Sequence, residues 1–443
     1  MRPQTKARLL LTRVASLLVM TSLAAFAAAQ SVDRIDVVRP DAPELAAYGT
    51  YDVGVRTLDF VDEGRPDVVN VRPDGTVPTY DRPFTVEVWH PADLAGNDPG
   101  GTYAVTTRDG STVAELGGRA VRDAAPDARG APYPLVIVSH GYPGNRYLLS
   151  HLAENLASKG YVVASIDHAD STYADAGPFA STLYNRPLDQ RFVLNEMERL
   201  AAGDGPLAGL LDADTTALVG YSMGGYGAVN AIGGGFTEAS AGLPFSPPRA
   251  LFERHLAGSD AFEARRDARI RAAIAIAPWG MNVGFWDDAG LAGIETPTLF
   301  MAGSVDDVAG YANGPRAIFE GAVNADRSLL TFVNANHNAA APIPAPSAAW
   351  ATGTYDHYAD PVWDTVRMNN VAQHFATAFL GLHLQGDGDM ARYLDLVPDA
   401  ADAVWSVDDD GTPTEDHTYW PGFAERTAVG LTFETLEAGE AAE

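Results

Sequence analysis

The sequence contains no cysteine among its 443 residues. That absence excludes disulfide bonds, thiolate metal sites and a cysteine nucleophile. If the protein uses a nucleophile, it must therefore be supplied by another residue type.

Basic residues are scarce, and the two lysines are Lys6 and Lys159. Thirty Lys and Arg residues face 58 Asp and Glu residues, which gives a formal net charge of −28. A surface of this charge repels polyanions, so nucleic acids and anionic membrane surfaces are not expected partners. Outside the N-terminal segment, no apolar run reaches the ~18 residues of a membrane span. We therefore expect no stable membrane insertion.

The N-terminal residues 1–29 have the pattern of a secretory signal peptide. Four basic residues lie in the first part, an apolar stretch covers 14–26, and three alanines at 27–29 form a small-residue cleavage site. We expect cleavage near Ala29 and export of the protein to the periplasm or the medium.

The next part of the chain predicts an antiparallel sheet edge. Val53 to Phe60 and Phe84 to Trp89 alternate apolar and polar residues, as half-buried strands do. Residues 30–50 are predicted to form an irregular arm. Residues 91–131 are rich in Gly, Asp and Pro, and we expect them to form a surface excursion, that is, a segment at the surface of the domain.

From residue 135 onward, continuous apolar runs replace the alternation, as in strands buried on both faces of a parallel sheet. The predicted strands are Leu135–Val138, Tyr161–Ile166, Thr216–Gly220, Ile270–Ile276, Thr298–Met301 and Leu329–Val333. Helical spacing predicts helices over Leu148–Lys159, Leu188–Leu200, Gly224–Ile232, Pro315–Ala322 and Val362–Leu384. Strands that alternate with helices predict an α/β fold with a mostly parallel, doubly wound sheet.

One segment interrupts this alternation. Gly233 to Arg269 is first rich in Gly, Ser and Pro and then amphipathic, which predicts a small cap above the strand ends. We expect one α/β domain over 30–398 with the cap at about 233–269. The remaining residues, 399–443, are predicted to form a C-terminal extension that packs on the domain.

The sequence from Ala217 to Gly225 predicts a nucleophile at Ser222. An apolar strand runs into Gly220-Tyr221-Ser222-Met223-Gly224, and a helix follows. A serine hydroxyl is a poor nucleophile, so it must protrude where a base can take its proton. A sharp strand-to-helix turn exposes it in this way, and the two glycines leave room for the turn.

Two backbone N–H groups are candidates for stabilising an oxyanion. The strand Leu135–Val138 is followed by Ser139-His140-Gly141-Tyr142, and the residue after His-Gly is where one donor arises. We therefore assign the donors to the N–H groups of Tyr142 and Met223. His140 is predicted to be a buried structural histidine and not a base.

The acid and the base are expected after the late strands, in the chain order serine, acid, histidine. Asp306 follows the strand that ends near Gly303, and His337 follows the next strand. Asp307 is the alternative acid, but Asp306 has the favoured spacing from Gly303. The rival histidines His357, His374 and His383 do not follow a strand.

With these residues placed, the chain resembles the α/β hydrolases, in particular their dienelactone-hydrolase-like and platelet-activating-factor-acetylhydrolase-like branch. The motifs that carry this resemblance are Tyr51–Arg56, Val86–Pro91, Ser139–Gly141, Gly220–Gly225 and Trp420–Phe423. Dienelactone hydrolases use a cysteine nucleophile, which this chain lacks, so that particular activity is not expected.

A second resemblance is local. Gly141-Tyr142, Ser222 to Gly225 and Ala277-Pro278-Trp279 look like the corresponding pieces of bacterial cutinases and polyester hydrolases. In that family a tyrosine and a tryptophan flank the acyl group, which implies that Tyr142 and Trp279 bind substrate. The cap and the C-terminal extension are not typical of compact cutinases.

We therefore expect a secreted serine hydrolase that cleaves carboxylic esters with Ser222, His337 and Asp306 through an acyl-enzyme. The expected partner is a small-molecule or lipid-like ester, with no metal and no cofactor; no oligomeric state is predicted. An amidase or peptidase could use the same triad, and a polyester hydrolase is a further alternative. A binding protein without catalysis could share the fold.

Overall fold

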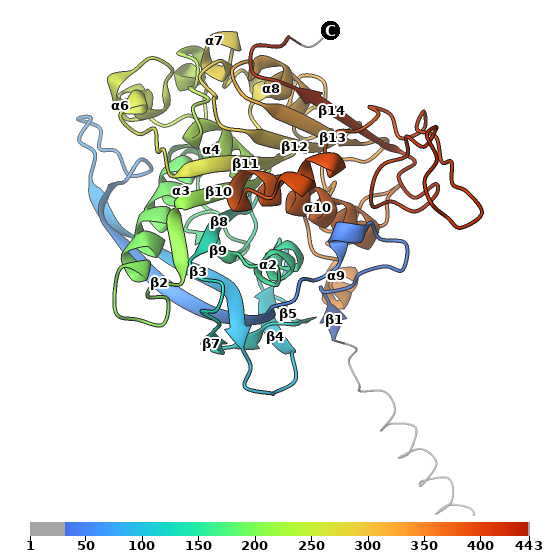
Figure 1. The fold of residues 1–443 in the computed structure, drawn as a ribbon. Helices are drawn as coiled ribbons and strands as arrows, with labels where there is room; N and C mark the ends of the chain where they lie inside the picture. The colour runs from blue at the N-terminus through green and yellow to red at the C-terminus, as the bar shows by residue number, and fades with distance from the viewer. Residues whose placement is uncertain (1–31, 442–443) are drawn as a thin grey trace, which may run out of the picture.

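The computed structural model describes residues 32–441, so the predicted signal peptide lies outside the described residues. A large twisted sheet runs through the centre of the molecule (Figure 1). From one edge to the other its strands are β14 (Leu431–Leu436), β13 (Arg327–Phe332), β12 (Thr298–Gly303), β11 (Ile270–Ile276), β10 (Leu211–Tyr221), β8 (Tyr133–Ser139), β9 (Val162–His168), β3 (Thr79–Asp93), β2 (Asp52–Pro66) and β6 (Val121–Arg122). The two-residue strand β7 (Ala125–Pro126) pairs with β3.

The central strands from β9 to β13 are parallel, whereas β3 is antiparallel to β9, β2 to β3, and β14 to β13. The helices on one face are α2 (Ser150–Ala157) and α10 (Thr365–Leu380), and those on the other are α3 (Phe179–Ala201), α4 (Met223–Ala231) and α8 (Pro315–Gly321). Successive residues of β8 belong to opposite cores, Leu135 and Ile137 to one and Val136 and Val138 to the other. This explains the uninterrupted apolar runs of the sequence.

Helix α3 begins at Phe179, well before the predicted start at Leu188, and it contains Pro187. A proline within a helix leaves the carbonyl of the fourth residue before it without an N–H donor. Here the hydroxyl of Tyr226 in α4 donates to the carbonyl oxygen of Leu183, at 3.1 Å. This tertiary hydrogen bond lets the helix continue through the proline.

Residues 91–131 contain more ordered structure than the predicted surface excursion. A second sheet consists of β1 (Asp33–Arg34), β5 (Val113–Gly118) and β4 (Gly101–Thr106). Tyr103 of β4 is buried, accepts a hydrogen bond from the Trp89 indole at 2.9 Å and donates to the Glu154 carboxylate at 2.5 Å. The excursion therefore contributes side chains to the core.

The segment predicted as a cap forms short helices, including α5 (Arg249–Phe252) and α6 (Asp260–Glu263). Its apolar side chains Phe236 and Phe252 are buried and stack on each other, and Phe236 also stacks on Tyr226 of α4. The segment thus lies against α4. The short helices α7 (Asp288–Leu291) and α9 (Ser347–Thr352) occur in later connections.

The C-terminal segment from 399 to 441 packs on the domain and also extends its sheet. Trp420 and Phe423 are buried beside Phe375 of α10. Residues 431–436 then form β14, which pairs antiparallel with β13 at the sheet edge. The segment is thus part of the sheet's architecture.

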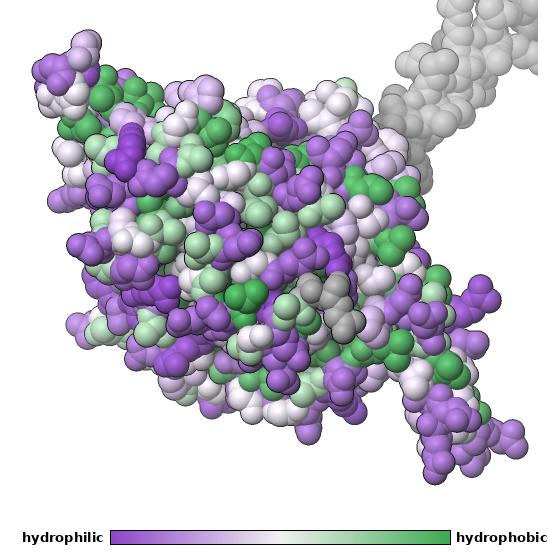
Figure 2. Space-filling view, turned by 90° about the horizontal axis from the view of Figure 1, so that it is seen from above, coloured by the Kyte–Doolittle hydropathy of each residue, from purple (hydrophilic) through white to green (hydrophobic). Residues whose placement is uncertain are grey.

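On the face seen in Figure 2, hydrophobic residues lie in small groups among hydrophilic ones. None of the helices between residues 32 and 441 combines the length and the apolar character needed to cross a membrane.

Several histidines are buried inside this fold. Burial lowers the pKa of His151, His168 and His374 to about 3 in each case. These side chains are therefore neutral in the folded protein at pH 5, whereas a histidine in the unfolded chain has a pKa near ~6.5. Because the unfolded state binds more protons between these values, stability falls as the pH is lowered through ~6.5.

His151 allows this linkage to be measured one residue at a time, because neither of its ring nitrogens has a hydrogen-bond partner among the described residues. His151→Leu should lower the slope of unfolding free energy against pH by about 1.4 kcal/mol per pH unit below pH 6. Urea unfolding at several pH values between 5 and 7.5 measures this slope. An unchanged slope would show that His151 is protonated in the folded state.

Candidate active site

The turn at Ser222 places its side chain between the end of β10 and the start of α4. Ser222 has φ 53° and ψ −113°, a conformation rare for a residue with a side chain. A Cβ on Gly220 would lie 2.2 Å from the carbonyl oxygen of Gly224, and one on Gly224 would lie 1.9 Å from that of Ser139. Only glycine fits at these two positions, so the close packing of strand and helix explains the motif.

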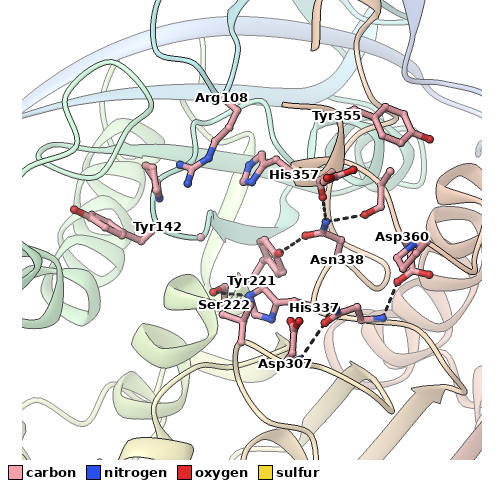
Figure 3. A pocket seen from close by; sticks show the side chains of 17 residues that line it. Arg108, Tyr142, Tyr221, Ser222, Asp307, His337, Asn338, Tyr355, His357 and Asp360 are labelled. Atoms are coloured by element: carbon pink, nitrogen blue, oxygen red, sulfur yellow. Dashed lines mark hydrogen bonds between the residues drawn. The ribbon is translucent and has the colours of Figure 1, made fainter. Parts of the chain in front are cut away.

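The structure brings Ser222, His337 and Asp306 together from three loops at the carboxyl edge of the sheet. Figure 3 shows Ser222 beside His337. His337 Nε2 lies 3.0 Å from Ser222 Oγ. His337 Nδ1 lies 2.9 Å from Asp306 Oδ2. These distances form a continuous chain of hydrogen bonds from the hydroxyl to the carboxylate.

Backbone groups hold the Asp306 carboxylate in place. Its Oδ1 accepts hydrogen bonds from the N–H groups of Val308, at 2.9 Å, and Ala309, at 2.8 Å. Burial alone would raise the pKa of Asp306, but the hydrogen bond and charge of His337 and these N–H groups outweigh it and hold the pKa below its usual value. Asp306 therefore remains ionised at neutral pH.

Asp307, the alternative acid, does not contact the His337 ring among the hydrogen bonds of the described residues. Its side chain is exposed at the edge of the site, and its N–H donates to Asn336 Oδ1 at 3.0 Å. The same oxygen accepts from the N–H of His337, at 2.7 Å. Asn336 thus joins the loop that carries the acid to the loop that carries the histidine.

The N–H groups of Tyr142 and Met223 are both available for a ligand. Within residues 32–441 neither donates a hydrogen bond to a protein acceptor. Met223 is the first residue of α4, where N–H groups have no partner inside the helix. Gly141 packs against Ser222, since a Cβ at Gly141 would lie 3.3 Å from that of Ser222. This arrangement can stabilise negative charge beside Ser222 Oγ.

A second Ser–His–Asp chain lies beneath this turn, but it is sealed from solvent. His168 Nε2 lies 2.9 Å from Ser139 Oγ, and His168 Nδ1 lies 2.9 Å from Asp189 Oδ2. Ser139 and His168 are each 1% exposed and Asp189 is 0% exposed, so no substrate can reach them. Asp189 also pairs with the buried Arg82, at 2.8 Å, which keeps it ionised.

Arg186 connects this buried layer to the oxyanion turn. Its guanidinium is buried, donates to the His140 carbonyl oxygen at 2.5 Å and donates to Ser171 Oγ at 2.5 Å. His140 is itself fully buried, and its Nδ1 lies 2.6 Å from the Gly141 carbonyl oxygen. These contacts fix the backbone that precedes Tyr142.

A cavity of about 590 Å³ opens over Ser222 and His337. The described residues that line it are Arg108, Gly141–Pro143, Tyr221–Ser222, Asp307–Val308, Asn336–Asn338, Tyr355–His357 and Ala359–Pro361. No residue of the predicted cap at 233–269 is among the described residues that line this cavity; Phe236 of the cap packs against α4, and Phe245 packs against Phe179 and Trp279. The cavity is bounded instead by the loop that follows His337 and by Arg108.

The two aromatic residues predicted to bind substrate differ in position. Tyr142 lines the cavity, and its ring packs edge-on against Phe179 at 5.2 Å. Trp279 is not among the lining residues: its ring packs against Phe179, at 5.3 Å, and against Phe285, while its backbone N–H donates to the carbonyl oxygen of Ser222 at 3.2 Å. The role of Trp279 in binding substrate stays a prediction.

Several of the lining residues could not be recognised from a local sequence pattern. Arg108 lies in the turn between β4 and β5, and Asn338 and His357 lie in the loop after His337. Asn338 accepts a hydrogen bond from the Tyr221 hydroxyl at 3.0 Å and thereby packs this loop against the nucleophile turn. Such contacts join segments far apart in the chain, so no local pattern predicts them.

His374 lies within α10 and His383 in the π-helical turn after it, and neither lines the cavity among its described residues. Within residues 32–441, no group of three or more His, Asp or Glu side chains is arranged to hold a metal ion.

Comparisons with known proteins find proteins of similar sequence and fold. Residues 111–191 match the family model of platelet-activating factor acetylhydrolase, isoform II, a segment that includes the oxyanion turn and ends before Ser222. Cutinase est1 of Thermobifida alba is 24% identical over 206 residues, which are 46% of this chain and 53% of the relative. Bis(hydroxyethyl) terephthalate hydrolase of Streptomyces coelicolor is 24% identical over 204 residues, 46% of this chain and 49% of the relative.

The chain thus spans about half the length of the curated relatives it matches. A solved structure, a ferulic acid esterase from Streptomyces cinnamoneus, superimposes with a TM-score of 0.53 at 21% identity, over 80% of this chain and 94% of that chain. The platelet-activating-factor-acetylhydrolase-like and cutinase-like resemblances are confirmed as similarities, and the dienelactone-hydrolase-like one stays a prediction. The chain therefore has the α/β-hydrolase fold, with sequence similarity to a cutinase and to a bis(hydroxyethyl) terephthalate hydrolase.

Proposed function

We propose that the protein is an exported serine hydrolase that cleaves carboxylic esters of short-chain or lipid-like substrates. The observation that carries the proposal is the hydrogen-bonded chain from Ser222 through His337 to Asp306 at the floor of an open cavity. The relatives named above as a cutinase, a terephthalate ester hydrolase and an esterase support an ester as the substrate.

Acylation would begin when Ser222 Oγ attacks the carbonyl carbon of the ester while His337 Nε2 takes its proton. Asp306 would hold the His337 tautomer that is protonated on Nδ1 and would stabilise the imidazolium that forms. The negative oxygen of the tetrahedral intermediate would accept hydrogen bonds from the N–H groups of Tyr142 and Met223. His337 would then donate the proton to the leaving alkoxide, and the alcohol departs.

Deacylation would repeat these steps with water in place of Ser222. His337 Nε2 takes a proton from the water, whose oxygen attacks the acyl carbon. Collapse of the second intermediate breaks the bond to Ser222 Oγ, which recovers the proton from His337. The free acid is released and the enzyme is regenerated.

The cavity supports small or lipid-like esters as substrates. Tyr142 would form one aromatic wall beside the acyl group. Because the segment 233–269 does not cover the cavity, the site is open to solvent at Tyr355 and Asp356, which are both exposed. An extended alcohol or acyl chain can leave the site in that direction.

Export is part of the proposal and rests on the pattern of residues 1–29. N-terminal sequencing of the protein recovered from the periplasm or medium of an expressing bacterium should give Gln30 or a neighbouring residue as the first. A mature chain that begins at Met1 would contradict it.

Ser222→Ala should lower kcat for p-nitrophenyl butyrate by about 10⁴-fold or more, because the nucleophile is lost. Ser139→Ala is the matched control, since it removes the serine of the buried Ser–His–Asp chain. The control should retain most of its turnover. Equal losses in the two variants, or full activity of Ser222→Ala, would contradict the assignment.

Substitution of each of the two neighbouring aspartates tests which of them is the acid of the triad. Asp306→Asn should lower kcat by roughly 10⁴-fold, because the amide favours the wrong tautomer of His337. Asp307→Asn should change kcat by less than about tenfold, since its side chain is exposed and does not bind the ring. Steady-state kinetics with one ester measure both, and the opposite order would assign the acid to Asp307.

The same triad could serve an amidase. Turnover of a matched ester and amide distinguishes the two activities directly. An ester and an amide with the same acyl group and aromatic leaving group should differ strongly in kcat/KM in favour of the ester. A larger kcat/KM for the amide would favour the amidase.

A further inference from the structure

Arg108 brings a positive charge to the cavity above Ser222 (Figure 3). Among the described residues that line the cavity, it is the only arginine or lysine. Its backbone N–H donates to the Tyr358 hydroxyl at 3.0 Å, and its guanidinium lies 5.9 Å from the centre of the Tyr173 ring. The hydrogen bond anchors the turn that carries Arg108, while the guanidinium remains directed to the cavity.

The Arg108 guanidinium has no acceptor and no ion-pair partner within residues 32–441. Several other arginines of this acidic protein have a carboxylate partner: Arg82 pairs with Asp189, and the exposed Arg249 pairs with Glu238. A guanidinium has five N–H donors, and half-burial without an acceptor removes water from them without replacement. An acceptor supplied by a ligand would satisfy them.

The aromatic residues around Arg108 contribute no second positive charge. His357 Nε2 lies 2.6 Å from the Tyr173 hydroxyl, and the two rings pack edge-on. Burial, together with the charges of Arg108 and His337, lowers the pKa of His357 to about 3, so this histidine is neutral at pH 7. Arg108 is then the fixed cation on this wall of the cavity.

The carboxylates that face the cavity do not neutralise Arg108. The buried Asp360 accepts hydrogen bonds from the backbone N–H groups of Asn336, Val362 and Trp363. Asp307 and Asp356 are exposed, and Asp307 lies on the opposite side of the Ser222–His337 pair from Arg108 in Figure 3. Asp307, Asp356 and Asp360 all line the cavity, but within residues 32–441 none of them forms an ion pair with Arg108.

We infer that Arg108 binds an anionic oxygen group of the ester substrate, a carboxylate or a phosphate, on the side of the scissile bond away from Asp307. This inference rests on the proposed ester hydrolysis at Ser222. The planar guanidinium can bind two oxygens of such a group at once, which fixes its orientation as well as its charge. Arg108 would thus select esters with a second, charged end over neutral esters of the same length.

Matched substrates test the inference. The carboxylate arm compares the mono-p-nitrophenyl ester of glutaric acid with p-nitrophenyl hexanoate, which has a similar length and no charge. A phosphate arm compares 4-(butyryloxy)phenyl phosphate with phenyl butyrate, and 4-carboxyphenyl butyrate places a carboxylate on the same leaving group. The measured quantity is the ratio of kcat/KM for the anionic ester to that for its neutral partner.

Arg108→Gln should lower this ratio about 10- to 100-fold in at least one arm, as expected for the loss of a hydrogen-bonded charge. Arg108→Lys should give an intermediate ratio, because the lysine ammonium is a point charge and cannot bind two oxygens at once as the planar guanidinium can. Arg72→Gln is the control: it removes the same charge from an exposed turn between β2 and β3, outside the cavity, and should leave the ratio unchanged. The arm that responds identifies carboxylate or phosphate.

A ratio that is the same in wild type and Arg108→Gln in every arm would overturn the inference while leaving the proposed function intact, provided that turnover is lost in Ser222→Ala. Equal loss of the ratio in Arg72→Gln would also overturn it, because the effect would then come from overall charge. Absence of Ser222-dependent turnover of all these esters would overturn the proposed function and this inference with it.

Discussion

The approach of α4 to the end of β8 is the contact on which the site depends. No side chain fits between the Gly224 Cα and the carbonyl oxygen of Ser139, and none fits at Gly220. The chain must therefore turn sharply at Ser222, which adopts a positive φ. The same contact sets the N–H of Met223 beside the turn that carries Tyr142. One packing constraint thus positions the hydroxyl and both N–H groups.

A buried polar layer supports that contact from below. Arg186 binds the carbonyl of His140, while Asp189 joins His168 to two arginines of the edge strands, Arg65 and Arg82. Charges buried in this way stabilise a fold only when each has a partner, and here each has several. The partners come from β2, β3, β9 and α3, so the oxyanion turn is tied to three strands of the sheet and to one helix.

Much of the fold followed from the sequence because its signals are local. Continuous apolar runs mark the strands of the parallel sheet, and the residues after β10, β12 and β13 meet at one edge because parallel strands end there. Asp306 and Asp307 could be ranked by their spacing from Gly303, and the hydrogen bonds of His337 involve Asp306. The start of α3 could not be predicted, since the helix passes through Pro187 with the help of Tyr226.

The residues that line the cavity could not be predicted from local sequence patterns, because they come from distant parts of the chain. Arg108 and His357 are about 250 positions apart, yet both line one cavity, where Tyr173 lies between them. The cap segment was expected above the strand ends from its position in the chain, and Trp279 was expected to bind substrate from the local resemblance to cutinases. In the structure Phe236 of the cap segment packs against Tyr226 of α4, and the Trp279 ring packs against Phe179.

The central claim is that Ser222, and not the serine of the buried chain, is the reactive residue. The most direct measurement is reaction of the folded protein with a fluorophosphonate, followed by mass spectrometry of its peptides. The account predicts a single modification on the peptide that contains Ser222, with labelling slowed strongly in His337→Ala. Modification at another serine, or no modification of the folded protein, would contradict it.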